Sequence, residues 1–318
     1  MDIKTKLKLA DLQSSENIAK LLPEEDLSNI GSTVVDDYEI DKESRSQWEK
    51  KMKAANELAM QMVKEKSFPW NGASNVKFPL LTIACLQFAS RAYPALVKAP
   101  DLVKFRVQGA DPMGEKAARA MRISSHMSWQ LLDQDESWEE EQDRAYIAVP
   151  ISGCVFKKSY YDPAKGHNCS KTVLPQDLVV HYYAKSLEDC ARKTETFKLY
   201  DRDIKERVLK GVYIEHDLPQ APIEDSDQKD ERQGLTPPAN DSDRPRSILE
   251  QHRFLDLDGD GYSEPYVVTV DKHSKKVFRI VHRFADVVTE QSVQIDKLKK
   301  QIAEIVQSLP PPEEAKTV

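Results

Sequence analysis

Residues 67–97 read SFPWNGASNVKFPLLTIACLQFASRAYPALV, and no other long stretch of this 318-residue chain places apolar side chains on every side of a predicted helix. Pro79 suits the first turn of that helix, because its missing N–H would have no partner there. A helix that is apolar all round is normally buried in a protein interior. We therefore expect it to be the central element, with four core residues: Trp70, Leu81, Phe88 and Tyr93.

The composition indicates a soluble globular protein. Hydrophobic residues make up 40% of the chain and aromatic residues 8%. The formal charge of -7 argues against a protein whose main role is to wrap nucleic-acid phosphates. Polar residues interrupt the apolar stretch, so no membrane span is expected. The basic N-terminus lacks the apolar middle region of a signal peptide, which favours a cytoplasmic product.

The order of patterns predicts an α+β fold, in which a helical N-terminal layer with a long buried helix packs on antiparallel β hairpins and a meander. Two short helices broken at Pro23 and Gly31 are expected in the first forty residues. A strand is expected over 102–107 and a long helix from Asp111-Pro112. Five segments are predicted. They are an N-terminal helical arm (1–40), an α+β core (41–216), an acidic and Pro-rich flexible loop (217–246), a β meander (247–285), and an amphipathic helix with a Pro-rich end (286–318).

The last predicted helix, 290–309, has the apolar spacing of a coiled-coil seam. Two heptads are too few for a stable isolated coiled coil. We interpret Pro310-Pro311-Pro312 as the break at the tip of a helical hairpin whose second arm lies beyond Val318. On this interpretation the 318-residue chain is mainly monomeric and 290–309 is mobile. The seam residues are Ile295, Leu298, Ile302, Ile305 and Leu309.

The run from Asp256 to Glu264 places carboxylates at alternate positions before a glycine, a spacing that lets side chains converge on Ca²⁺. It is not an EF-hand, because Val267 occupies the position of the closing glutamate and strands flank the run. The alternative is a hairpin turn that uses Asp and Gly for their backbone preferences. The candidate ligands are Asp256, Asp258, Asp260 and Glu264, and no other cofactor is expected.

No catalytic motif is present in the sequence. The seven histidines have no metal-ligand spacing, and the chain lacks a phosphate-binding P-loop, a nucleophile elbow and a dinucleotide fingerprint. The acidic run 136–143 is interpreted as the solvated face of a helix. The chain is therefore expected not to be an enzyme.

Two runs resemble the N-terminal half of tailed-phage portal proteins of the podovirus type, and they occur in the same order. The first is Trp70-x-Gly72-Ala73-Ser74-Asn75 followed by Phe78-Pro79-Leu80 and Gln87-Phe88-Ala89-x-Arg91-Ala92-Tyr93-Pro94. The second is Glu250-x-His252-x-x-Leu255-Asp256-x-Asp258-x-Asp260-Gly261 followed by Glu264-Pro265-Tyr266. The resemblance covers roughly residues 45–285. Because portal proteins are much longer, it implies only their peripheral, wing-like part.

The resemblance implies a structural role as head-to-tail connector. Portal proteins form rings, usually dodecamers, that pass double-stranded DNA without sequence specificity during packaging and ejection. Their partners are further copies of themselves, terminase, coat and scaffold proteins and the tail adaptor. The location implied is the host cytoplasm during assembly and then the portal vertex of the virion, or a prophage origin. Two other functions stay open: a calcium-binding α+β interaction module and an enzyme whose nucleophile the sequence does not reveal.

Overall fold

The computed structural model describes residues 15–61, 66–76, 78–162, 165–222, 243–257 and 263–283, and every structural statement below concerns these residues. Helices and antiparallel sheets both occur, which confirms the expected α+β class. None of the described helices is both long enough and apolar enough to cross a membrane. The predicted helix 290–309 lies outside the described residues.

The chain divides into two compact units. Unit 1 contains the described residues of Met1–Glu39, Tyr183–Pro222 and Ser242–Val318, and unit 2 those of Ile40–Tyr182 and Ile223–Asp241. The predicted segments follow the order of the chain, whereas unit 1 combines stretches that are far apart in the sequence.

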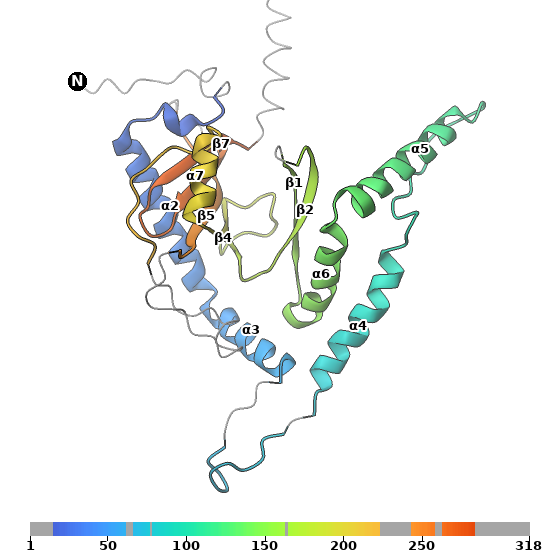
Figure 1. Ribbon diagram of the computed structural model, residues 1–318, viewed down its shortest axis with the longest axis horizontal. Coiled ribbons are helices and arrows are strands. Elements are labelled where there is room, and N and C mark those ends of the chain that lie inside the picture. Colours follow the sequence, from blue (N-terminus) through green and yellow to red (C-terminus); the bar gives the residue numbers. More distant parts are fainter. Residues whose placement is uncertain are drawn as a thin grey trace, which may run out of the picture. The chain divides into compact units, whose positions relative to one another are not determined.

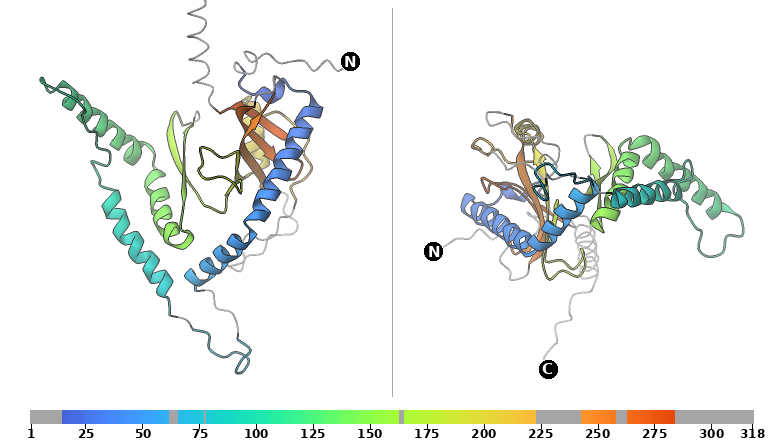
Figure 2. Two further views of the ribbon diagram at one scale, coloured as in Figure 1. Left: turned by 180° about the vertical axis from the view of Figure 1, so that it is seen from behind. Right: turned by 90° about the horizontal axis from the view of Figure 1, so that it is seen from below.

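Unit 1 is built on antiparallel strands β4 to β7, with α2 against one face of them (Figures 1 and 2). The meander expected over 249–281 is confirmed by the three strands β5, β6 and β7. Residues of one face alternate with residues of the other, as the two-residue period of a strand requires. The bounds are β4 (Arg192–Leu199), β5 (Arg246–Leu255), β6 (Glu264–Asp271) and β7 (Val277–His282).

Helix α2 (Glu24–Ser44) continues through Gly31, so the predicted break at that glycine is wrong. Gly31 is buried where the helix approaches the turn between β6 and β7. Asp37 on the same helix pairs with Arg192 at 3.3 Å and with Arg253 at 3.2 Å. These contacts fix the part of α2 that belongs to unit 1 on the sheet.

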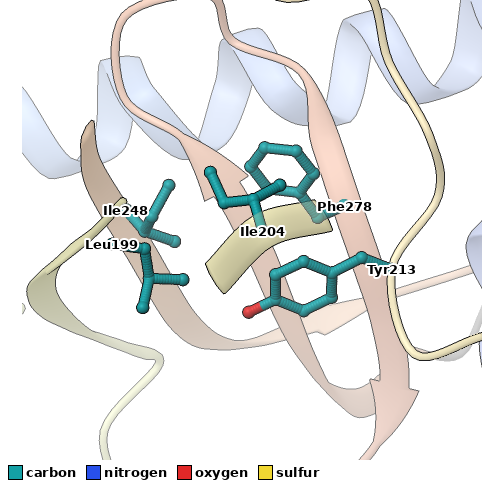
Figure 3. Packing of buried hydrophobic residues seen from close by; sticks show 5 residues of the cluster. All are labelled: Leu199, Ile204, Tyr213, Ile248 and Phe278. Atoms are coloured by element: carbon teal, nitrogen blue, oxygen red, sulfur yellow. The ribbon is translucent and has the colours of Figure 1, made fainter. Parts of the chain in front are cut away.

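The opposite face of the sheet is covered by α7 (Asp201–Leu209). The ring of Tyr213 stacks on Phe278 with centroids 5.2 Å apart, and Arg207 donates a hydrogen bond of 2.6 Å to the Tyr213 hydroxyl. Burial raises the pKa of Tyr213. Figure 3 shows the resulting cluster, whose buried members are Leu199, Ile204, Tyr213, Ile248 and Phe278.

Asn17 joins the start of the described chain to strand β7. Its side-chain amide donates to the carbonyls of Val212 and Phe278, both at 3.0 Å. Its side-chain oxygen accepts from the backbone N–H groups of Ala19 and Ile280, both at 3.1 Å. The side chain is 1% exposed, and all of its polar groups are satisfied, as a buried amide requires.

Unit 2 consists mainly of helices and one β hairpin. The antiparallel hairpins expected from the sequence are represented here by β1 (Phe156–Asp162) and β2 (His167–Val173), which pair antiparallel. The strand expected over 102–107 does not form, because no described segment pairs with it. The remaining elements are α3 (Ser46–Ala59), α4 (Leu80–Leu96), α5 (Glu115–Trp129), η2 (Gln130–Gln134), α6 (Trp138–Ser152) and β3 (Leu178–Val180).

Candidate functional site

The segment that the sequence singled out forms a turn followed by α4. Asn71-Gly72 forms a turn: Gly72 has a φ of 78°, and Lys66 and Ala73 form an isolated antiparallel bridge. A positive φ costs glycine little because it has no Cβ. The chain then enters α4 at Leu80, directly after Pro79, as the first-turn preference of proline predicts.

Helix α4 is covered on one side only. It packs on α6 and, less extensively, on α3, and the fully buried positions are Cys85 and Ala89, which lie one turn apart. Thr82 on this side donates its hydroxyl to the carbonyl of Ala59. On the other side of the helix, the apolar residues Ile83, Leu86 and Phe88 are exposed.

The expected core assignment is therefore wrong for two of its four residues. Trp70 is 67% exposed and Phe88 is 45% exposed. Leu81 and Tyr93 are only half-buried. The physical reason is that an all-round apolar helix needs neighbours on every side to bury it, and unit 2 supplies them on one side.

We name the exposed large side chains of this segment the α4 apolar surface. Isolated exposed apolar residues are ordinary, but a run of them within two dozen residues is typical of a surface that another protein covers. Aromatic side chains are also the residues that contribute most to protein interfaces. The members are Phe68, Trp70, Val76, Phe78, Leu80, Ile83, Leu86 and Phe88, each at least 38% exposed.

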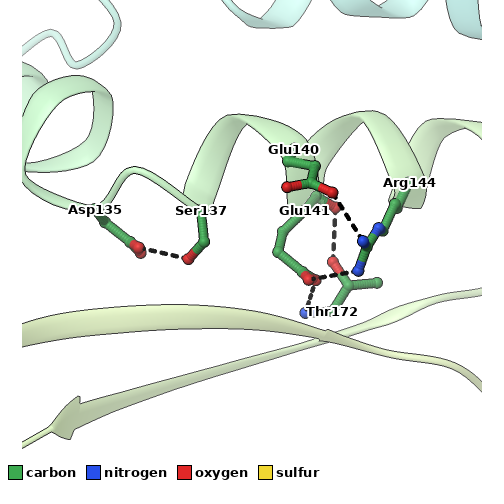
Figure 4. A network of polar contacts seen from close by, with 6 residues as sticks. All are labelled: Asp135, Ser137, Glu140, Glu141, Arg144 and Thr172. Atoms are coloured by element: carbon green, nitrogen blue, oxygen red, sulfur yellow. Dashed lines mark hydrogen bonds and ion pairs between the residues drawn. The ribbon is translucent and has the colours of Figure 1, made fainter.

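A polar network fixes α6, the helix on which α4 packs, against β2 (Figure 4). The buried Asp135 carboxylate accepts hydrogen bonds from the Ser137 hydroxyl at 2.7 Å and from the Ser170 N–H at 3.1 Å. The Glu141 carboxylate accepts from the Thr172 N–H at 2.7 Å, and the Thr172 hydroxyl donates back to the Glu141 carbonyl at 2.7 Å. Charge-assisted bonds of this kind are stronger than neutral ones, so α6 is a firm support for α4.

The same network corrects the interpretation of the acidic run 136–143 as a wholly solvated face. Glu141 is half-buried against β2, and Glu139 accepts a hydrogen bond from the Tyr93 hydroxyl on α4. Glu140 is exposed and pairs with Arg144 at 2.8 Å. The first two carboxylates therefore connect structural elements, and only part of the run faces solvent.

The proposed calcium ligands are only partly described. Asp256 directly follows β5 and Glu264 begins β6, so the run does connect two strands as the hairpin interpretation requires. Asp258 and Asp260 lie outside the described residues. Among the described residues, no three His, Cys, Asp or Glu side chains come together in a way that could hold a metal ion.

His282 lies near the same end of the sheet, and its surroundings predict a stability that depends on pH. Its ring contacts that of Tyr266, with centroids 4.4 Å apart, and its Nε2 is buried with no hydrogen-bond partner among the described residues. Burial lowers the pKa of His282 below its ordinary value of 6.5. Between the lowered pKa and 6.5 the unfolded chain binds more protons than the folded one, so stability is lost as pH falls through this range.

We expect the urea midpoint to fall less between pH 7.5 and pH 5 in His282→Phe than in the unsubstituted protein. The exposed His273 supplies the matched control, His273→Phe, which should keep the full pH dependence. Urea titrations at a series of pH values measure the difference. Identical pH dependence in His282→Phe and the unsubstituted protein would show that His282 protonates equally easily when folded.

Comparison of the sequence with protein-family models and with curated proteins finds no match. The resemblance to portal proteins therefore depends on the two quoted runs of residues. The first run forms the turn and α4, and the described part of the second forms β5 and the beginning of β6.

Proposed function

We propose that this chain is a subunit of a phage portal ring of the podovirus type, or the wing-like N-terminal part of one. The observation that carries the proposal is the α4 apolar surface. Four members of the first resembling run, Trp70, Phe78, Leu80 and Phe88, are exposed. Residues that merely filled the interior of this chain would be buried, whereas a ring subunit has a neighbour on each side to cover such residues.

Two further features support the proposal. The net charge of -7 suits a protein that lets DNA pass without holding its phosphates. The α4 helix packs on α6, which is itself hydrogen-bonded to β2, and a preformed surface loses less conformational entropy when a neighbour binds to it. In the proposed role the chain has no chemical step to perform, and its partners are further copies of itself, terminase, coat and scaffold proteins and the tail adaptor.

The first test is the identity of the neighbouring reading frames, where we expect a large terminase and a scaffold or coat gene. The second is co-expression of the chain with those coat and scaffold products. Antibody labelling in electron micrographs should then mark one vertex of each head. Labels on no head, or on many vertices of one head, would contradict the proposal.

The contribution of the α4 apolar surface is tested by the double variant Leu80→Glu/Phe88→Glu. We expect labelled heads to become at least about tenfold rarer, because loss of central apolar contacts costs 2 kcal/mol or more in typical interfaces. Lys50→Glu/Lys51→Glu on exposed positions of α3 is the control and should assemble normally. Circular dichroism must show that both variants are folded. Normal assembly of the Leu80/Phe88 variant would mean that another surface joins the subunits.

A further inference from the structure

A second unpartnered feature of unit 2 is the segment Lys104–Gln108, which lies between α4 and α5 (Figure 1). Val103, Phe105 and Val107 alternate with polar Lys104, Arg106 and Gln108, which is the two-residue pattern of a strand with one apolar side. The segment nevertheless belongs to no sheet among the described residues. A sequence that favours a strand is thus present without a strand to pair with.

Hydrogen bonds to α5 fix Val103, the residue just before this segment. The Val103 N–H donates to the Ser128 hydroxyl at 3.0 Å, and the Ser124 hydroxyl donates to the Val103 carbonyl. From Lys104 to Gln108, no backbone group forms a hydrogen bond with another described residue. Free backbone groups in an extended segment are the donors and acceptors with which an incoming strand pairs.

A shallow groove of about 260 Å³ lies beside this segment. One side is formed by Phe105 to Gln108 and the other by α5, through Lys116, Arg119, Ala120 and Ile123. Three of its lining residues are cations, and none is acidic. Two carboxylates lie close to the lining in sequence: Glu115, which is exposed and directly precedes Lys116, and Asp111, which accepts hydrogen bonds from the N–H groups of Lys116 and Ala117 at the start of α5.

We propose that this groove binds an extended acidic peptide segment of a partner protein, which pairs as a strand with Lys104–Gln108. The free backbone would fix the direction of the peptide, and Arg106, Lys116 and Arg119 would select its acidic side chains. A nucleic-acid strand fits less well, because its phosphates do not offer alternating donors and acceptors at the spacing of a peptide.

The test uses fluorescence anisotropy with a labelled octapeptide of alternating Glu and Thr. We expect saturable binding of this peptide and none of the Lys-Thr counterpart. Arg106→Glu/Arg119→Glu should weaken binding at least about tenfold, because two favourable charge pairs become repulsive. Lys50→Glu/Lys51→Glu on α3 changes the net charge equally and should leave the affinity unchanged. Equal weakening in both double variants would show attraction to net charge only, and would overturn the proposal.

A second probe separates strand pairing from charge attraction. The Glu-Thr octapeptide with two central residues replaced by Pro keeps most of its charge but loses backbone donors. We expect it to bind at least about tenfold more weakly, and we expect only the unsubstituted peptide to slow amide exchange of residues 104–108. Equal affinity of the two peptides would overturn the proposal, and so would tighter binding of an oligothymidylate than of the Glu-Thr peptide. None of these results depends on whether the chain assembles into a portal ring.

Discussion

Ala89→Asp is expected to lower the free energy of unfolding by several kcal/mol, whereas Phe88→Asp should lower it by less than about 1 kcal/mol. Ala89 is 7% exposed on the side of α4 that packs within unit 2, and a carboxylate there would be buried without a partner. Phe88 is 45% exposed, so a carboxylate at that position remains in water. Because several kcal/mol is comparable with the whole stability of a domain, Ala89→Asp protein should be largely unfolded.

The matched control is Ala84→Asp, which makes the same exchange at an exposed position of the same helix. It should retain a folded spectrum in far-ultraviolet circular dichroism. Urea titration of Ala84→Asp and Ala89→Asp then compares one chemical change at an exposed and at a buried position, and Phe88→Asp adds a second exposed position. An equally large loss of stability at positions 84 and 89 would mean that α4 is buried on both sides, as the sequence alone suggested.

The difference between Phe88 and Ala89 shows what periodicity cannot determine. Apolar residues all round α4 predict a helix that is buried on every side, whereas the structure leaves one side of it exposed. They do not indicate whether the covering surface belongs to the same chain or to another. The sequence therefore predicted the helix and its hydrophobicity, but wrongly placed Trp70 and Phe88 in the core of this chain.

The β meander was predictable because its signals are local. β5, β6 and β7 follow one another in the chain, and short turns join neighbouring antiparallel strands. The segment 102–108 carries an equally clear strand pattern but has no described strand beside it. Strand formation depends on a partner as well as on residue preference, and the pattern does not say where that partner is.

The basic groove beside the same segment was missed for a different reason. Its cations come from two separate places in the chain, Arg106 and the first turns of α5, within a protein of negative net charge. Counting charge over the whole chain hides such a local excess. A windowed charge count over residues 98–122, where Lys and Arg outnumber Asp and Glu, would have been the one available signal.

Gly31 is the clearest case in which local preference gives the wrong answer. Glycine disfavours helix interiors by about 1 kcal/mol relative to alanine, so a helix was expected to end there. In α2 the absence of a side chain is what allows the helix to approach the turn between β6 and β7. A Cβ on Gly31 would lie 2.0 Å from the Lys275 carbonyl oxygen and 3.3 Å from a methyl group of Val277.

Gly31→Ala is therefore expected to destabilise unit 1 by about 2 kcal/mol or more, although the same exchange in an open helix is stabilising. The clash is with a backbone oxygen, so rotation of a side chain cannot relieve it. The turn itself is held by hydrogen bonds from the Lys275 N–H to the Asp271 carbonyl at 2.9 Å and from the Ser274 N–H to the Asp271 carboxylate at 2.9 Å. Either α2 or this turn must therefore move, and movement of either one would disturb buried contacts.

Urea unfolding of Gly31→Ala, followed by circular dichroism, measures the effect. Ser28→Ala, at an exposed position of the same helix, is the control and should be neutral or slightly stabilising because alanine has the higher helix propensity. Both substitutions place alanine in α2. At position 31 the new Cβ would clash with the Lys275 carbonyl oxygen, whereas at position 28 the Cβ that is already present stays at an exposed position. A Gly31→Ala protein as stable as Ser28→Ala would show that α2 lies farther from the β6–β7 turn, and that the glycine serves no packing role.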